Sequence, residues 1–486
     1  MKKRIICILL AALLTSSFVS CGGEAPPAET TAQVEQNADI SAEETEPVIP
    51  ALPVADMNGF TMRISNIDPT ALAWANIDIL VEQDGTPVND AIFQRNIELE
   101  DTYNCKFEQT LQSGFSDVAY INNMVTAGSD DYDICMIYDI RAAETVGAML
   151  DWNQLPHLDL SQVWWNPDAT DMFAIAGSQY YTAGNMTMGY LSRAMCYLVN
   201  WNLYNDIGFT EDLYALVNEG KWTQDVFFTM AAQGVMDTNG DGAYTADDTY
   251  GTFGNPRAFL NTLMGGANIR YVEADENGSF LFRMKENETA VNLLTEAVQF
   301  MTTNPHIYYN EGQSPSDLKP DTLFTTGQAL FHVQGLPHTI AQLREMDDSF
   351  GILPLPKLNE TQQKYYAPSY GAALTGIPKT VAVDRYEYLG LLLEAMTRRS
   401  QELVVPQYKE VLLKDKLTRD EASAEMLDII FNSITFDPGV VLWCSNISDK
   451  ICADIFMKRS DAIVSYLEKQ TPVFQGLIDK FNEALS

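Results

Sequence analysis

The chain has 486 residues, of which 46% are hydrophobic and seven are tryptophan. A chain of this length exceeds one ordinary hydrophobic core, so we expect two or more lobes. The 66 acidic residues outnumber the 30 basic ones, which gives a formal net charge of −36. This surplus argues against nucleic acid as a partner and against electrostatic docking to anionic lipid.

The N-terminus has the layout of a signal peptide, which we predict at residues 1–20. A basic start at residues 2–4 is followed by an apolar run at 5–14 and by small and polar residues up to Cys21. This run is too short to span a bilayer permanently. The motif Phe-Val-Ser-Cys that ends at Cys21 resembles a bacterial lipobox, in which the cysteine is lipidated. We therefore expect an extracytoplasmic protein anchored to the cell membrane by lipid; a secreted protein cut nearby is the alternative.

Folding signals begin after residues 21–53, which are rich in Ala, Glu, Thr and Pro and indicate a disordered tether. The next segments alternate between strand and helix patterns, which predicts an α/β lobe with a mainly parallel sheet. We expect Asn89 or Asp90 to cap the first of these helices. The segments are a strand at 60–64, a helix at 90–103, a strand at 105–110, a helix at 117–127 and a buried strand at 132–138.

A second set of elements follows an aromatic, loop-rich region. The nearly continuous apolar run at 194–200 predicts another buried strand. Later segments are predicted as strands at 329–333 and 350–356, and as helices at 213–220, 223–234, 288–301, 385–397, 423–431 and 449–485.

The cysteines indicate buried thiols rather than a disulfide framework. Five follow Cys21, an odd number, and none of them forms a C-x-x-C pair. Several stand among apolar residues, where a free thiol behaves as a small hydrophobic group. The five are Cys105, Cys135, Cys196, Cys444 and Cys452.

Residues 237–248 have the spacing of an EF-hand calcium loop, with Asp at the twelfth position, where Glu is usual. A hard dication needs several oxygens from one short loop, and Gly242 allows the sharp turn at position six. A solvated turn is the simpler interpretation. We predict a structural Ca²⁺ held by the carbonyl of Ala243 and the side chains of Asp237, Asn239, Asp241 and Asp248.

Four passages carry a resemblance to a known family. They are residues 196–204, residues 220–225 followed by 237–251, residues 324–331 and residues 351–357. In this order and spacing they resemble the extracellular solute-binding lipoproteins of bacterial ABC importers, in the family 1 or sugar-type group.

This resemblance implies an α/β, two-lobed periplasmic-binding-protein-like (type II) fold with a hinge and an interlobe cleft. Residues 54–183 and 368–436 would form lobe one, and residues 184–367 would form lobe two with the calcium-like loop. Residues 437–486 would supply C-terminal helices near the hinge and lobe two.

The resemblance also implies a function without catalysis. The chain would be a monomer that captures a carbohydrate, most naturally an oligosaccharide, by hinge closure and delivers it to the ABC permease subunits in the membrane. Two alternatives stay open, a secreted glycoside hydrolase and a calcium-dependent carbohydrate or adhesion module. Four histidines are present, and no H-E-x-x-H, G-x-S-x-G or P-loop motif occurs.

A sugar-binding cleft needs flat apolar faces for the ring and carboxylates or amides for the hydroxyl groups. Aromatic residues in loops and a carboxylate at the end of a buried strand are therefore candidates. Each aromatic has core packing as its simpler alternative. The predicted ligand-binding residues are Trp74, Tyr138, Asp139, Trp165, Tyr370 and Trp443.

Overall fold

The structure is a computed structural model of the chain. It describes residues 51–115, 117–310, 322–336, 343, 346–414 and 421–485. The chain divides into two units, Met1–Ala51 and Leu52–Ser486, and all the elements that follow belong to the second. The predicted signal peptide, Cys21 and the tether up to residue 50 lie outside the described residues. Within the described ranges, no helix has both the length and the apolar character needed to cross a bilayer.

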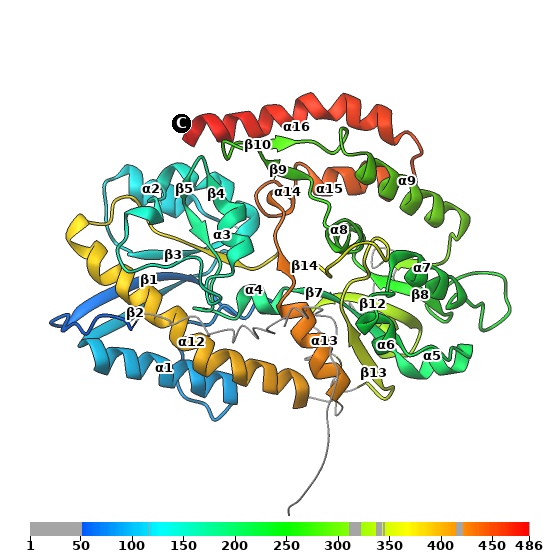
Figure 1. The fold of residues 1–486 in the computed structure, drawn as a ribbon, viewed down its shortest axis with the longest axis horizontal. Coiled ribbons are helices and arrows are strands. Elements are labelled where there is room, and N and C mark those ends of the chain that lie inside the picture. Colours follow the sequence, from blue (N-terminus) through cyan, green and yellow to red (C-terminus); the bar gives the residue numbers. More distant parts are fainter. Residues whose placement is uncertain are drawn as a thin grey trace, which may run out of the picture. The chain divides into compact units, whose positions relative to one another are not determined.

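The first sheet consists of β1 (Phe60–Ile67), β2 (Cys105–Gln112), β3 (Ile134–Tyr138), β6 (Tyr181–Thr182) and β15 (Ala373–Gly376). Their order is β2-β1-β3-β15-β6, and Figure 1 labels β1, β2 and β3. β1 pairs in parallel with both β2 and β3, while β15 runs antiparallel to β3 and β6. The carboxyl ends of the three parallel strands therefore meet at one edge of this sheet.

The helices around this sheet confirm the predicted alternation, with one correction. The helix predicted from residue 90 begins earlier, and Thr86 stands at its N-cap without a side-chain bond. The expected cap at Asn89 or Asp90 is wrong because Pro87, whose fixed φ suits the first helical turn, starts the helix. The helices are α1 (Pro87–Tyr103), α2 (Ala119–Thr126), η1 (Asp139–Glu144), η2 (Val146–Ala148), η3 (Trp152–Gln154) and α3 (Pro167–Phe173).

The second sheet consists of β7 (Met195–Asn200), β8 (Tyr250–Gly254), β11 (Tyr308–Asn310), β12 (Ala329–Gly335) and β13 (Phe350–Leu353). Its order is β11-β8-β12-β7-β13. β8 pairs in parallel with β11 and β12, whereas β7 runs antiparallel to β12 and β13. Every residue of β7 is buried, as its apolar run predicts.

Short helices precede and follow these strands. They are α4 (Gly189–Ser192), α5 (Trp201–Ile207), α6 (Leu213–Asn218), α7 (Gln224–Gln233), α8 (Pro256–Gly266), α9 (Glu288–Thr303) and α10 (Thr322–Thr325). Two-stranded pairs are formed by β4 (Ala174–Ile175) with β5 (Ser178–Gln179), and by β9 (Val272–Ala274) with β10 (Phe280–Phe282).

The chain first passes from β6 of the first sheet to β7 of the second, and a bridge between Ala194 and Ser369 joins this passage to two later crossings, at β14 (Ala367–Pro368) and at β16 (Ile434–Thr435). β14 leads from the second sheet back to β15, and it pairs in parallel with β16. The C-terminal helices α14 to α16 follow the crossing at β16, and α16 contacts β10 (Figure 1). The helices after β15 are η5 (Val383–Arg385), α12 (Tyr386–Lys414), α13 (Glu421–Phe431), α14 (Pro438–Val441), α15 (Ser448–Ile451), η6 (Cys452–Phe456) and α16 (Ile463–Leu485).

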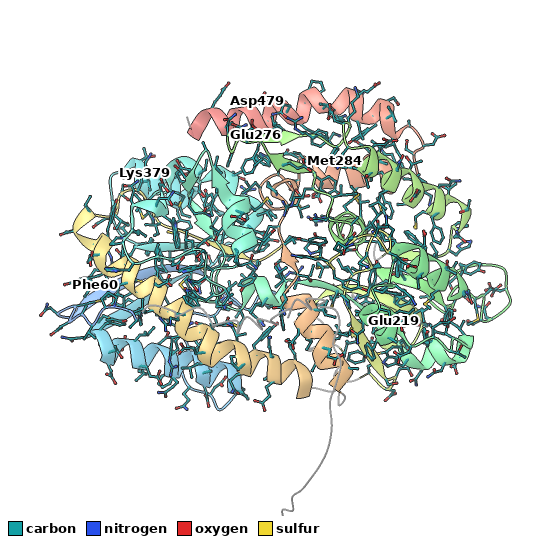
Figure 2. All side chains as sticks on the ribbon, in the orientation of Figure 1. Phe60, Glu219, Glu276, Met284, Lys379 and Asp479 are labelled. Atoms are coloured by element: carbon teal, nitrogen blue, oxygen red, sulfur yellow. The ribbon has the colours of Figure 1, made fainter. Side chains whose placement is uncertain are left out.

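Side chains fill the space between these elements (Figure 2). The buried hydrophobic residues form a cluster around the second sheet and the C-terminal helices, and another around the first sheet and α12. All five cysteines predicted as buried thiols are buried and free.

Candidate functional site

Three aromatic rings form a row along the carboxyl edge of the first sheet. Trp74 lies in the loop after β1, Phe115 in the loop after β2, and Tyr138 is the last residue of β3. The ring centroids of Trp74 and Phe115 are 5.7 Å apart, and those of Phe115 and Tyr138 are 5.3 Å apart, both edge to face. All three side chains are partly exposed. The row presents apolar ring surface at the edge where α/β folds bind their ligands.

Gly371 joins this row to the crossing at β14. Its φ of +79° is one that side chains with a Cβ rarely adopt. Its carbonyl accepts a hydrogen bond of 3.2 Å from Nε1 of Trp74, and its N–H donates one of 2.6 Å to Oδ2 of Asp139. The crossing is thereby tied to the end of β3 and to the first ring of the row.

Asp139 is buried, with 2% of its surface exposed. Its carboxylate accepts hydrogen bonds from the backbone N–H groups of Ile140, Gly371 and Ala372. Burial nevertheless raises its pKa to about 7, an increase that these donors and the charge of Arg193 only moderate. The carboxylate thus lies beside the row, but its oxygens are occupied by hydrogen bonds from backbone N–H groups.

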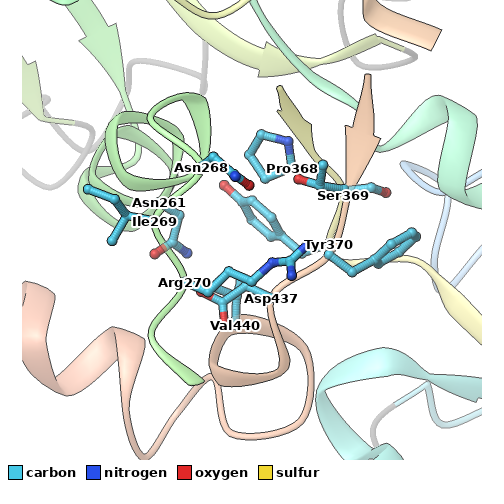
Figure 3. A pocket seen from close by; sticks show the side chains of 12 residues that line it. Asn261, Asn268, Ile269, Arg270, Pro368, Ser369, Tyr370, Asp437 and Val440 are labelled. Carbon is cyan, nitrogen blue, oxygen red and sulfur yellow. The ribbon is translucent and has the colours of Figure 1, made fainter. Parts of the chain in front are cut away.

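Tyr370 lies next to Gly371 with 9% of its surface exposed, and its hydroxyl is buried without a hydrogen-bond partner. It lines a small cavity at the crossings, together with Pro368, Asn261 and Asp437 (Figure 3). The Nδ2 of Asn261 is also buried and unpartnered. Two polar groups at this cavity, the Tyr370 hydroxyl and the Asn261 amide nitrogen, therefore lack hydrogen-bond partners at a point where the chain crosses between the sheets.

Arg193 approaches the same crossing from the second sheet, where it directly precedes the strand segment that contains β7. Its side chain is buried, with 8% of the residue exposed, and its Nε donates a 3.0 Å hydrogen bond to the carbonyl of Tyr370. A Cβ on Gly371 would lie 3.4 Å from that Nε. The guanidinium thus packs on one side of the peptide that Trp74 and Asp139 bind from the other lobe.

The structure brings together four of the six predicted ligand-binding residues, Trp74, Tyr138, Asp139 and Tyr370. Trp165 lies elsewhere: it is fully buried, its Nε1 donates a 2.6 Å hydrogen bond to Glu394, and its ring meets that of Trp152. Trp443 is 5% exposed and packs edge to face against Phe280 and Phe481.

Two residues of this site were not among the ligand-binding residues predicted from the sequence. Phe115 stands in the loop after a predicted strand, so the reasoning that selected Trp74 would have selected it as well. Arg193 carries a charge directly before a fully apolar run, which is an available signal, because such a residue sits at the end of a buried strand.

The predicted calcium loop lies between α7 and β8, and a bridge between Met236 and Thr249 closes it. Asp237 accepts hydrogen bonds from the N–H groups of Gly240 and Gly242, at 2.7 and 2.8 Å. Asn239 accepts from Asp241, and Asp241 accepts from Ala243. Gly242 has a φ of +80°, as the predicted sharp turn requires.

Asp248 closes the other end of this loop, and its surface is fully buried. It accepts hydrogen bonds from the N–H groups of Thr245 and Thr238, which hold its pKa below the ordinary value. The hydroxyl groups of the same two threonines also donate to its two oxygens, at 3.3 and 3.4 Å. Over the described ranges, no three His, Cys, Asp or Glu side chains are arranged to hold a metal ion.

The similarity of this chain to known proteins lies in its structure. No protein-family model matches the chain. No curated protein sequence matches it. Solved structures match over most of its length, and three of these proteins are each 12% identical to this chain in a match that covers 88% of it.

One of the three is the galacto-N-biose/lacto-N-biose I-binding protein of an ABC transporter from Bifidobacterium longum, with a TM-score of 0.54 over 98% of that protein. Another is the cyclic alpha-maltosyl-1,6-maltose binding protein from Arthrobacter globiformis, at 0.53 over 97%. The third is an ABC substrate-binding protein from Listeria monocytogenes in complex with cycloalternan, at 0.50 over 99%. At these identities the likeness establishes the fold. The chain has the two-lobed α/β fold of type II periplasmic binding proteins, as its sequence predicts.

Proposed function

We propose that this chain is the solute-binding component of an ABC importer, and that it captures a carbohydrate outside the cytoplasm. The observation that carries the proposal is the aromatic row of Trp74, Phe115 and Tyr138 at the carboxyl edge of the first sheet. Ring faces of this kind pack against the C–H surface of a sugar. The three structural neighbours add support, because each bears the name of a carbohydrate-binding or ABC substrate-binding protein.

The mechanism in this proposal is binding followed by closure about the crossings between the two sheets. A sugar would first settle on the row, which belongs to the first lobe. The second lobe, which carries Arg193, would then close on it. Release to a permease in the membrane would complete the cycle, and a lipid on Cys21 would keep the protein near that permease.

A thermal-shift screen over oligosaccharides, combined with mass spectrometry of co-purified solute, tests the function. We expect stabilisation by a carbohydrate and a 1:1 complex by calorimetry. Trp74→Ala should weaken binding about tenfold or more, because it removes one ring of the row. Trp201→Ala is the matched control, since that partly buried tryptophan contacts Tyr204 and Tyr214 in the second lobe. Failure of every carbohydrate to bind would contradict the proposal.

A glycoside hydrolase would also bind sugars, so turnover must be measured on the same ligand. We expect the bound oligosaccharide to be recovered intact after prolonged incubation with the protein. Release of shorter sugars at a rate proportional to protein concentration would favour the hydrolase instead.

Calcium in the loop at 237–248 is a separate proposal, with a structural role. Oxygen atoms in EF-hand spacing support it, and an extracellular site would need only millimolar affinity. We expect chelation to lower the melting temperature while sugar affinity stays nearly unchanged. At a free calcium concentration of ten times its Kd, binding to the folded state would raise the free energy of unfolding by about 1.4 kcal/mol. Asp241→Asn should abolish the effect of the chelator, and equal melting of the unmodified protein with and without chelator would contradict a bound ion.

A further inference from the structure

We propose that Arg193 binds an acidic group on the solute, a carboxylate or a sulfate ester, so that the captured carbohydrate is an anionic one. This inference rests on the proposed function and names the class of its ligand. It starts from the surroundings of the guanidinium, which the sequence did not single out.

The guanidinium has donors that the protein does not use. Arginine carries five N–H donors, and among the described residues Arg193 donates only through its Nε. None of the carboxylates that the structure describes forms an ion pair with it. Other arginines differ: Arg257 lies 3.1 Å from Asp449, and Arg270 lies 3.0 Å from Asp168.

A buried cation with unused donors is costly, because it has lost water without gaining acceptors. Burial accordingly lowers the pKa of Arg193. Asp139 is a poor counter-ion, since three backbone N–H groups occupy its oxygens and burial raises its pKa to about 7. The Nη atoms are not among the fully buried, unpartnered atoms of the described residues, so an acceptor from solvent or from a solute can reach them.

The guanidinium packs directly against two glycines. A Cβ on Gly335, at the end of β12, would lie 3.0 Å from Nη1. A Cβ on Gly371 would lie 3.5 Å from Nη2. An oxyanion suits this planar fork, because two of its oxygens accept parallel N–H bonds.

The position links this donor to the aromatic row. Arg193 packs on the peptide of residues 370 and 371, and the carbonyl of Gly371 accepts from Trp74. A sugar on the row would thus carry its acidic substituent toward the guanidinium. A site with a buried donor pair also rejects a ligand that lacks the acceptor, which gives selectivity against neutral sugars.

Isothermal titration calorimetry with matched glycans tests the inference. One arm compares oligogalacturonides with galacto-oligosaccharides of equal length, and the other compares sulfated galacto-oligosaccharides with the same unsulfated ones. We expect one acidic series to bind about tenfold to a hundredfold more tightly than its neutral match, a range typical of a charge-assisted hydrogen-bond pair. The series that binds identifies carboxylate or sulfate. Added salt should weaken that acidic ligand more than the neutral one.

Variants assign the preference to this residue. Arg193→Met should remove the acidic preference, so that the acidic and the neutral glycan of a matched pair bind with equal affinity. Arg193→Lys should retain part of it, because lysine keeps the charge without the fork. Arg283→Met, at an exposed arginine, is the matched control and should behave as the unmodified protein. Circular dichroism establishes that each variant is folded.

The outcomes separate the inference from the function. Equal affinity of the unmodified protein for acidic and neutral glycans would overturn the inference and leave the function standing. An acidic preference that survives in Arg193→Met would also overturn it. If neither class binds, the function fails and the inference fails with it.

Discussion

At the scale of single residues, Asp139 shows how a predicted site residue can serve the backbone. The sequence places it at the end of a buried strand, and the structure puts it there, beside Tyr138 and Gly371. Its carboxylate is buried and bound by backbone N–H groups, so it positions the crossing rather than offering both oxygens to a sugar.

This burial predicts a pH dependence of stability. The pKa of Asp139 rises from 3.8 to about 7 on folding, so the folded protein holds the proton more tightly. The associated stability is complete below the unfolded pKa and is lost as the pH rises to about 7. As the pH rises from about 4 to about 7, the free energy of unfolding of Asp139→Asn should increase relative to that of the unmodified protein, by up to about 4 kcal/mol. Melting curves from pH 4 to pH 8 measure it.

Asp384→Asn, at an exposed carboxyl, serves as the control and should show a difference that does not change over this range. A constant difference for Asp139→Asn as well would mean that the carboxyl is charged throughout.

Trp165 shows the limit of residue-level prediction. It shares with Trp74 an aromatic ring and a loop position, and the sequence holds no local signal that separates them. Glu394, which binds the Nε1 of Trp165, lies 229 residues away in the chain. Only the assembled fold reveals that one indole faces the core and the other the edge of the sheet.

Trp165→Phe should therefore affect stability and not binding. The replacement keeps a ring but removes the N–H that Glu394 accepts, at a position with no exposed surface. We expect the free energy of unfolding to fall by about 1–3 kcal/mol. Urea denaturation measures this loss, and calorimetry should give an unchanged sugar affinity. A tenfold loss of affinity without a loss of stability would instead place Trp165 in the binding site.

At the scale of elements, the strands buried on both faces were the most predictable. β3 and β7 are nearly continuous apolar runs, and both are buried almost throughout. Helix starts were less predictable, because capping depends on backbone geometry: Asn89 and Asp90 suit a cap by type, yet Pro87 starts α1. Predicting the site requires the order of the strands in the sheet. Phe115 is recognised as a site residue only once that order places it beside Trp74 and Tyr138.

The packing of α7 on β8 gives a prediction at this scale. A Cβ on Gly251 would lie 2.0 Å from the carbonyl oxygen of Ala231, a backbone atom that can yield only if the helix shifts. Gly251→Ala should cost about 1–3 kcal/mol or more. Gly476→Ala, inside α16 with no atom within 4 Å of the new Cβ, should instead stabilise by about 0.5–1 kcal/mol. Urea midpoints compare the two, and equal effects would contradict this packing.

At the scale of the whole molecule, the chain builds two sheets and crosses between them three times, between β6 and β7, at β14 and at β16. The resemblance of four sequence passages predicted this two-lobed fold, and the structural neighbours bear it out. The ligand was beyond prediction because it depends on side chains that the fold gathers from distant segments. Trp74 and Gly371 are 297 residues apart, and Arg193 and Tyr370 are 177 apart.

The central claim is that the two lobes close around a carbohydrate held on the aromatic row. Small-angle X-ray scattering of the protein with and without a bound oligosaccharide tests it most directly, with Trp74→Ala at the same ligand concentration as control. We expect the radius of gyration to fall when the sugar binds to the unmodified protein and to stay constant for the variant. Identical scattering curves with and without saturating sugar would contradict closure.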